Sequence, residues 1–264
     1  MSYGVREFGM TAISNGVLLH GGYRVFTGTF LVFMEYARNA VRLAALMQIP
    51  NIFVYTHDSV AVGEDGPTHQ PVEQLTSLRT TPGLETWRPC DTVESAIAWQ
   101  QAIASTTNPS ALIFTRQNTV AQPRNEEAFN NINKGGYVLL DCDKTPDVIL
   151  IATGSEVELA VEAAATLTDD GRQVRVVSMP CAERFVAQDA AYQAAVLPDA
   201  VRARVAVEAA HPDYWFRFVG LDGEVVGIAR YGLSAPGGQA MAELGMTAAN
   251  VVASAQRLLA EHSA

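Results

Sequence analysis

Short apolar runs that alternate with helical stretches constrain the fold of this chain more than any other feature. The runs Ile52–Tyr55 and Ala111–Thr115 each have the length and composition of a buried strand. Similar runs recur later in the chain at Val148–Ala152, Val174–Ser178, Val205–Ala209 and Val225–Ile228. Strands that alternate with helices in this way predict an α/β fold with mostly parallel, Rossmann-like sheets.

The stretch from residue 117 to residue 136 interrupts this pattern with polar residues, a proline and paired glycines. A chain of 264 residues is long enough for two medium-sized domains. We therefore expect a first α/β domain at residues 1–122, a linker at 123–136 and a second α/β domain at 137–264.

Two helix starts can be read from capping residues. Asp91 and Glu94 have the spacing of a capping box for a helix that runs to Ile103, and Ser155 and Glu158 have the same spacing before another helix. The turn at Gly154 and Ser155 lacks the glycine pattern and the lysine of a nucleotide-binding loop, so we do not expect it to bind a nucleotide.

Charge and cysteine content exclude several classes of function. A formal net charge of −10 disfavours a nucleic-acid partner, because phosphate backbones require a basic surface. The three cysteines are scattered and lack the spacing of a disulfide framework or a zinc site. No apolar run approaches the ~18 residues of a membrane span, and no targeting segment is evident. We expect a soluble cytoplasmic protein without a membrane partner.

The loop from Thr56 to Pro71, which follows the run Ile52–Tyr55, carries most of the chemistry. Parallel α/β sheets bind ligands beyond the carboxyl ends of their strands, so this loop should line a crevice. Thr68 can cap a helix that starts near His69. The loop gathers His57, Asp58, Glu64, Asp65 and His69. Imidazoles and carboxylates together suit a polyhydroxylated, anionic small molecule. A metal site and an ordinary solvated loop are the alternatives, although the spacing matches no compact metal-ligand pattern.

Several stretches of the chain resemble the transketolase family. They include YGVREFGMTAISNGVLLHGGYRVFTGTFLVFMEYARNAVRLAALM, YTHDSVAVGEDGPTHQPVEQLTSLR, WRPCDTVESAIAW, FTRQN, IATGSEVELA, RVVSMP and SAP. The resemblance extends over essentially the whole chain. It implies a pyrimidine-binding domain, incomplete here, and a carboxyl-terminal transketolase domain. It also implies thiamine diphosphate as cofactor and transfer of a two-carbon ketol unit from a ketose phosphate to an aldose phosphate, within the pentose phosphate pathway.

The resemblance assigns four residues to the cofactor. Glu7 matches a glutamate that hydrogen-bonds the aminopyrimidine ring of thiamine diphosphate and activates it, and apolar groups should surround such a carboxyl. Phe30, Phe33 and Tyr36 match aromatic residues that line the pocket of that ring. Without the resemblance, Glu7 would be read as a surface partner of Arg6. The aromatic residues would then be read as the core of a helix over 31–47.

The resemblance also assigns the substrate contacts. His57 matches a residue near the substrate phosphate, and Asp65 one that holds the hydroxyl beside the reacting carbonyl. His69, which we count with Glu7 as catalytic, matches a residue that contacts the first hydroxyl groups of the donor. Arg116 matches the arginine that binds the phosphate of the sugar, a group that a guanidinium can grip with two hydrogen bonds. An arginine after a strand is otherwise most often part of a surface ion pair.

A transketolase subunit also has an amino-terminal domain that binds the diphosphate and a Mg2+ or Ca2+ ion, and this sequence does not match it. We therefore expect a carboxyl-terminal portion of the enzyme. It could be a truncated product, a separately made piece or the product of a partial gene model. We expect it to be inactive alone, to lack metal ligands, and to work with an amino-terminal transketolase domain or subunit, as a homodimer acting on sugar phosphates. Its first sheet should have an exposed edge.

Two other interpretations remain open. The chain could be a non-catalytic dimerisation or interaction module, or part of a related enzyme such as dihydroxyacetone synthase or deoxyxylulose-phosphate synthase. The GEDGPTHQP and SAP segments favour transketolase. We expect no catalytic residue after Arg116. We expect His211 and the aromatic residues that follow it to belong to the core or to a subunit contact.

Overall fold

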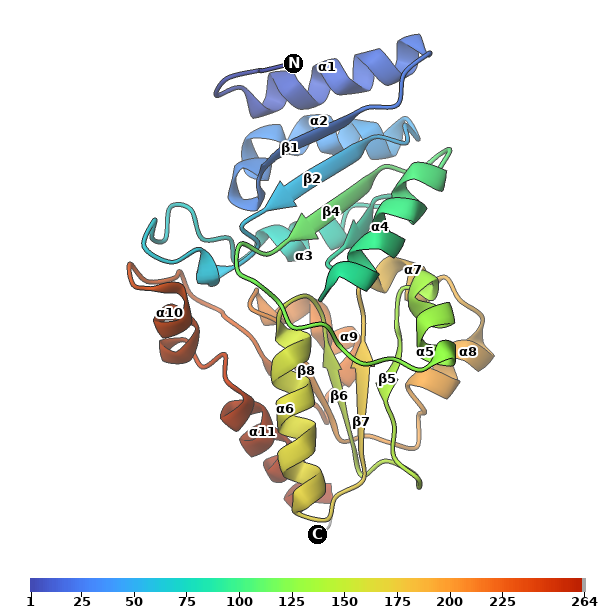
Figure 1. Ribbon diagram of the computed structural model, residues 1–264, viewed down its shortest axis with the longest axis vertical. Helices are drawn as coiled ribbons and strands as arrows, with labels where there is room; N and C mark the ends of the chain where they lie inside the picture. Colours follow the sequence, from blue (N-terminus) through green and yellow to red (C-terminus); the bar gives the residue numbers. More distant parts are fainter. Residues whose placement is uncertain (263–264) are drawn as a thin grey trace.

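The computed structural model describes residues 1–262 and contains two β-sheets that lie one beyond the other along the longest axis (Figure 1). The amino terminus lies beside the outer edge of the first sheet, and the last helix, α11 (Ala248–His262), lies at the opposite end of the molecule (Figure 1). The prediction of an α/β fold with two mostly parallel sheets is confirmed.

The first sheet has four parallel strands in the order β1-β2-β4-β3. Its strands are β1 (Phe26–Phe30), β2 (Ile52–Thr56), β3 (Glu85–Trp87) and β4 (Ser110–Phe114). The apolar runs predicted β2 and β4 to within a residue. They did not predict β1, in which Thr27, Gly28 and Thr29 separate two phenylalanines, or β3, which is three residues long.

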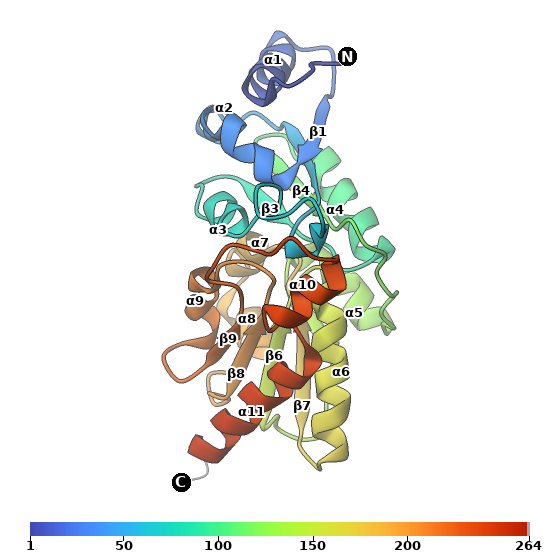
Figure 2. The ribbon, with the colours of Figure 1, turned by 90° about the vertical axis from the view of Figure 1, so that its left-hand side faces the viewer.

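The helices of this half of the chain are α1 (Glu7–His20), η1 (Leu31–Phe33), α2 (Met34–Leu46), η2 (Val60–Val62), α3 (Gln74–Arg79) and α4 (Thr92–Ala104). Helices lie on both sides of the first sheet, with α2 and α3 on one side and α4 on the other (Figure 2). Phe53 and Tyr55 point to the face that α2 covers, while Ile52 and Leu112 pack with Ala98 on the face of α4. The Asp91 half of the predicted capping box of α4 is confirmed, because the Asp91 carboxylate accepts hydrogen bonds from the backbone N–H groups of residues 93 and 94. The Glu94 carboxylate accepts from the backbone N–H of Cys90, one residue before the cap.

The second sheet has the order β5-β7-β6-β8-β9, with β5 antiparallel to β7 and all other pairs parallel. Its strands are β5 (Tyr137–Leu140), β6 (Val148–Ala152), β7 (Val174–Ser178), β8 (Arg204–Val207) and β9 (Glu224–Val226). The predicted bounds of β6 and β7 match the structure. In the structure, β8 and β9 each start one residue earlier and end two residues earlier than predicted.

Helices on the two faces of the second sheet close two cores. They are α5 (Glu126–Asn131), η3 (Ile132–Lys134), α6 (Glu156–Asp169), α7 (Ala182–Val186), α8 (Ala190–Val196), η4 (Pro212–Trp215), α9 (Phe216–Val219), α10 (Gly237–Glu243) and α11 (Ala248–His262). Along β6, Leu150 packs with α6 and α11, while Ile149 and Ile151 pack with Trp215 on the opposite face. This alternation is the period of two that a strand imposes. The aromatic residues after His211 are therefore mainly core, as expected.

The predicted capping box of α6 is wrong. Ser155 makes no capping hydrogen bond to the backbone of the helix, and its hydroxyl is instead bonded to the Glu156 carboxylate at 2.7 Å. Glu156 is fully buried and takes part in a long-range ion pair, so a contact that the local spacing does not encode decides the geometry here.

Candidate functional site

Three neighbouring strands of the first sheet end in register. Phe30 lies beside Thr56, and Thr56 lies beside Phe114, so the residues that follow β1, β2 and β4 emerge at one edge. His57 follows β2 directly, and Arg116 lies two residues beyond β4. Helix α1 runs antiparallel to β1, so its first turn lies at the same end of the sheet (Figure 1). This edge is where parallel sheets place their ligands.

Five of the predicted site residues form one connected group of rings at this edge. The His57 ring stacks on Phe30 with 3.6 Å between the ring centroids, and Phe30 lies nearly parallel to Phe33 at 5.9 Å. Phe33 also meets the edge of His69 at 5.4 Å and lies 6.2 Å from Tyr36. Phe33 therefore joins both histidines to the predicted aromatic residues, and Tyr36 remains 68% exposed.

Charged residues near His57 shift the pKa of its imidazole in opposite directions. Loss of solvation lowers the pKa of His57, and the positive charge of Arg116 lowers it further, whereas Asp65 and Asp58 raise it. Arg116 and Asp65 are therefore within electrostatic reach of this ring. The Arg116 side chain is exposed and makes no ion pair or hydrogen bond with any residue in 1–262, so it is available to an anion.

The loop that carries Asp65 and His69 is held by the second half of the chain. The Gln70 amide donates to the carbonyls of Gly63 and Leu233 and accepts from the Leu233 N–H. Gly66 has a φ of +79°, and a Cβ there would lie 2.6 Å from the hydroxyl of Ser234, the first residue of the SAP segment. The loop is thus fixed in an irregular path rather than free in solvent.

The prediction of a helix starting near His69 is wrong. Residues 67–69 form a turn, His69 Nδ1 is hydrogen-bonded to the Thr68 hydroxyl at 2.9 Å, and α3 begins only at Gln74. Gln70 explains the difference, because its amide reaches across to Leu233 and holds the chain out of a helical path. His69 therefore gains no helix N-terminus, although it still lies against Phe33.

Glu7 is the first residue of α1, and its side chain is half-buried. Helix α1 is fastened to the sheet by buried amides: Asn15 donates to the carbonyl of residue 40, and Asn51 donates to the Asn15 side chain. The expected apolar surrounding is incomplete, since Phe8 is 50% exposed while Met10 is buried. Glu7 makes no ion pair with Arg6 within the described residues, so the alternative interpretation as a surface pair has no support.

Sequence reasoning missed a buried ionic network behind the loop. Asp58, to which we assigned no role, binds Arg88. Arg88 in turn contacts Glu156, the first residue of α6, and Glu208, which directly follows β8. Arg79 pairs with Glu208 through two hydrogen bonds of 2.6 and 2.7 Å. The sequence offered two signs of this network: a charged residue, Asp58, close to the end of a buried strand, and an arginine, Arg88, in the WRPC segment.

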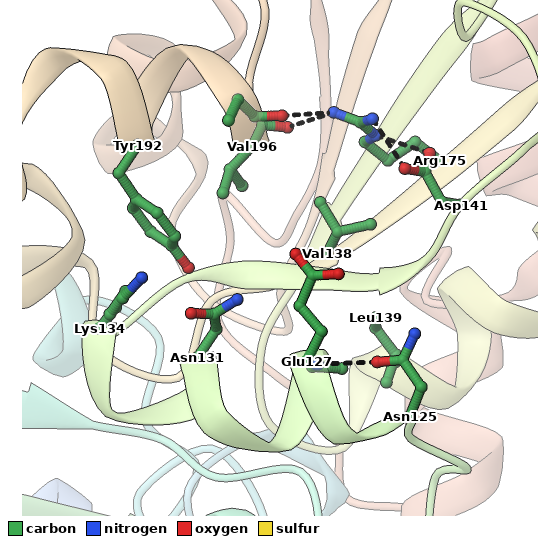
Figure 3. A pocket seen from close by; sticks show the side chains of 12 residues that line it. Asn125, Glu127, Asn131, Lys134, Val138, Leu139, Asp141, Arg175, Tyr192 and Val196 are labelled. Atoms are coloured by element: carbon green, nitrogen blue, oxygen red, sulfur yellow. Dashed lines mark hydrogen bonds and ion pairs between the residues drawn. The ribbon is translucent and has the colours of Figure 1, made fainter.

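A cavity of about 460 Å³ lies elsewhere, between α5, β5 and α8 (Figure 3). Its charged groups largely satisfy one another: Arg175 is paired with Asp141 at 2.8 Å, and the Lys134 ammonium lies 4.0 Å from the centre of the Tyr192 ring. None of the predicted site residues lines it. We therefore place the candidate site at the edge of the first sheet.

Two other kinds of feature are absent from residues 1–262. No group of three or more His, Cys, Asp and Glu side chains in this part of the chain is arranged to hold a metal ion. Within the same residues, no helix is long and apolar enough to cross a membrane.

Comparisons with known proteins agree on one family. Residues 1–122 match the family described as "Transketolase, pyrimidine binding domain", and residues 135–247 match "Transketolase-like TK C-terminal domain". Transketolase 2 of Vibrio vulnificus is 60% identical over 258 residues, which are 98% of this chain and 39% of that protein. The chain thus spans about two fifths of the length of the curated relatives it matches.

Solved structures give the same picture. Transketolase from Leishmania mexicana superimposes with a TM-score of 0.92 at 43% identity, covering 98% of this chain and 37% of that one. A variant transketolase of Pichia stipitis, described as a complex with xylulose-5-phosphate, gives a TM-score of 0.93 at 39% identity and covers 99% and 38%.

Proposed function

This chain belongs to the transketolase family, and on that premise we propose that it supplies the pyrimidine-binding and sugar-binding part of a transketolase active site. The complete enzyme would transfer a two-carbon ketol unit from a ketose phosphate to an aldose phosphate. The matched relatives are named transketolases, which favours this reaction over those of dihydroxyacetone synthase and deoxyxylulose-phosphate synthase.

The observation that carries the proposal is the ring group of Phe30, Phe33 and the two histidines, with Arg116 close enough to lower the pKa of His57. A sugar phosphate requires donors and acceptors for its hydroxyls and a cation for its phosphate. His57 and His69 supply imidazole nitrogens, and Asp65 accepts hydroxyl hydrogens. The guanidinium of Arg116 is exposed and has no partner among residues 1–262, so it can bind the phosphate through two hydrogen bonds. Their contribution is to position the substrate.

The same edge fits the pyrimidine end of thiamine diphosphate. Phe33 and Tyr36 leave aromatic surface exposed, and a flat heterocycle can stack on such surface. Glu7 is the first residue of α1, whose first turn lies at the same end of the sheet. There its protonated carboxyl group can donate a hydrogen bond to a ring nitrogen of the cofactor. When bound, thiamine diphosphate supplies the nucleophilic carbon for the attack on the ketose carbonyl. Met10, which is buried, and Phe8, which is half exposed, would supply only part of the apolar surround of the Glu7 carboxyl.

The remaining parts of the site would come from an amino-terminal transketolase segment, in the same polypeptide or in another. Residues 1–262 offer no metal-ligand group, so we assign Mg2+ or Ca2+ and the diphosphate contacts to that segment. Strand β1 is the outer strand of its sheet within these residues, and a groove of about 950 Å³ runs along it. Tyr23 and Phe26 line the groove and are mostly exposed. A free strand edge with apolar neighbours favours pairing with another segment.

Finer assignments rest on the family resemblance. We propose that the complete enzyme is a cytoplasmic homodimer of the pentose phosphate pathway, with domains at 1–122 and 137–264 joined by a linker at 123–136. The Pichia stipitis protein is described as a complex with xylulose-5-phosphate, which supports a ketose phosphate as donor.

The test is ketol transfer from xylulose 5-phosphate to ribose 5-phosphate with thiamine diphosphate and magnesium. It is run with this chain alone and again with an added amino-terminal transketolase segment. We expect activity in the mixture and none in the chain alone. A folded chain that stays silent in both would contradict the proposal and favour an interaction module.

A further inference from the structure

His57 has a backbone conformation that needs support. Its φ is +60°, and the only other non-glycine residue with a positive φ within residues 1–262 is Gln48. For a residue with a side chain this conformation costs about 1–2 kcal/mol, so it persists only where the surroundings impose it. The His57 ring itself is held against Phe30, and its Nδ1 is hydrogen-bonded to the Thr56 hydroxyl at 2.9 Å.

The next residue, Asp58, supplies a fixed point directly after the strained position. Its side chain is 2% exposed. Asp58 Oδ2 accepts a hydrogen bond from Arg88 Nε at 2.9 Å and lies 2.8 Å from Arg88 Nη2. A buried carboxylate that loses such a partner pays the full cost of desolvation, so the pair resists separation. Fixing Asp58 fixes the direction in which the chain leaves His57.

Arg88 carries this constraint to the second sheet. It is 0% exposed, and its Nη1 donates to the carbonyl of Thr153 at 3.1 Å, to the Glu156 carboxylate and, at 3.4 Å, to Glu208. The carbonyl of Thr153 and the carboxylate of Glu208 directly follow β6 and β8. The crevice that parallel sheets commonly offer to ligands is thus filled by a guanidinium from the first half of the chain.

Each acidic partner of Arg88 is itself anchored. Glu156 Oε2 also accepts from the backbone N–H of Ala209 at 3.0 Å. Glu208 accepts from Trp215 Nε1 at 2.7 Å and from Arg79 through two hydrogen bonds. A chain of buried charged contacts therefore runs from the core of the second sheet to the residue after His57.

We propose that Asp58 is a positioning residue for His57, and that through Arg88 the second sheet holds this part of the loop in its sugar-binding geometry. The value of that geometry for catalysis rests on the proposed function, whereas the positioning itself does not. The second sheet then contributes to the site without contacting substrate, although no residue after Arg116 was expected to serve the reaction.

A purely structural role predicts a different result, and Asp91 provides the matched control. Asp91 is also buried and also pairs with an arginine, Arg124, at 2.6 Å, and Arg124 in turn donates to Tyr137 of the second sheet. Asp91→Asn therefore weakens a comparable contact between the two halves of the chain without touching the loop. Asparagine also keeps the helix cap, because it is as good a capping residue as aspartate.

The primary experiment is NMR of the histidine rings in this chain, with His57→Gln and His69→Gln for assignment. Stacking on Phe30 should give the His57 ring protons an upfield shift. We expect Asp58→Asn to remove that shift and to leave His69 unchanged, because Gln70 holds the other end of the loop. Asp91→Asn should leave both rings unchanged. Arg88→Lys, which keeps the charge but cannot span both partners, should act like Asp58→Asn and serves if that variant does not fold.

An unchanged His57 signal in Asp58→Asn and Arg88→Lys would overturn the proposal. The kinetic consequence is measured separately, in the mixture with the amino-terminal segment and normalised to folded protein. There Asp58→Asn should lower kcat/KM by up to about 100-fold, mainly through KM, while Asp91→Asn should not. A displaced His57 ring with unchanged kcat/KM would support the positioning role and contradict the sugar-binding role of His57.

Discussion

Gly154 is the residue at which the contact between the two sheets can be tested most sharply. Its φ is +58°, and a Cβ added there would lie 2.7 Å from both Cζ and Nε of Arg88. Two separate effects should therefore lower the free energy of unfolding in Gly154→Ala. The first is the strain of a left-handed alanine, about 1–2 kcal/mol. The second arises because Arg88 is pinned by carboxylates and must move, which breaks buried ion pairs at about 3–5 kcal/mol.

Gly171 is the matched control, because it separates the two costs. It has a φ of +82°, and a Cβ there would meet nothing within 4 Å, so Gly171→Ala carries the strain alone. Urea unfolding should show a loss of about 1–2 kcal/mol for Gly171→Ala and at least about 3 kcal/mol more for Gly154→Ala. Equal losses in the two variants would refute the reasoning, since they would mean that the space at Gly154 does not depend on a fixed Arg88.

Two further predictions concern pH and the proposed phosphate contact. Burial raises the pKa of Glu183 to about 7, so between about pH 4.5 and 7 the native state holds a proton that the unfolded chain has released. The free energy of unfolding should therefore fall as pH rises through this window, and Glu183→Gln should reduce that fall in urea titrations; identical slopes would contradict it. Arg116→Ala should raise KM for the sugar phosphate in the active mixture by about 10-fold or more, with little change in kcat and in thermal stability, because the side chain is exposed. A lower melting temperature with unchanged KM would assign Arg116 to folding instead.

The strands that the sequence predicted best are the most apolar. Val148–Ala152 is buried at every position, so its apolar run marks both of its ends. Strand β1 was missed because Thr27 and Gly28 interrupt its apolar residues, and its identity as a strand depends on pairing with β2. Apolar pattern thus marks the bounds of a strand best where burial is complete, as in β6, and misses a strand whose apolar residues are interrupted, as in β1.

Within the site, the sequence predicted which residues gather but not what holds them. The resemblance named Phe30, Phe33, Tyr36, His57 and His69, and these residues are in ring contact. The turn before His69 and the geometry of Ser155 were mispredicted for one reason. Each is decided by a partner far along the chain, Leu233 through Gln70 in one case and Arg88 through Glu156 in the other. Local spacing carries no information about such partners.

If this chain contributes the cofactor-activating carboxyl group of a transketolase site, replacing that carboxyl with an amide in Glu7→Gln should abolish most of the activity. Ketol transfer is measured in the mixture with the amino-terminal segment, thiamine diphosphate and magnesium. Glu64→Gln is the control, because Glu64 is an exposed carboxylate in the loop to which we assign no role. We predict that Glu7→Gln lowers kcat by about 100-fold or more while Glu64→Gln leaves it unchanged. Equal activity of the two variants would show that Glu7 does not activate the cofactor.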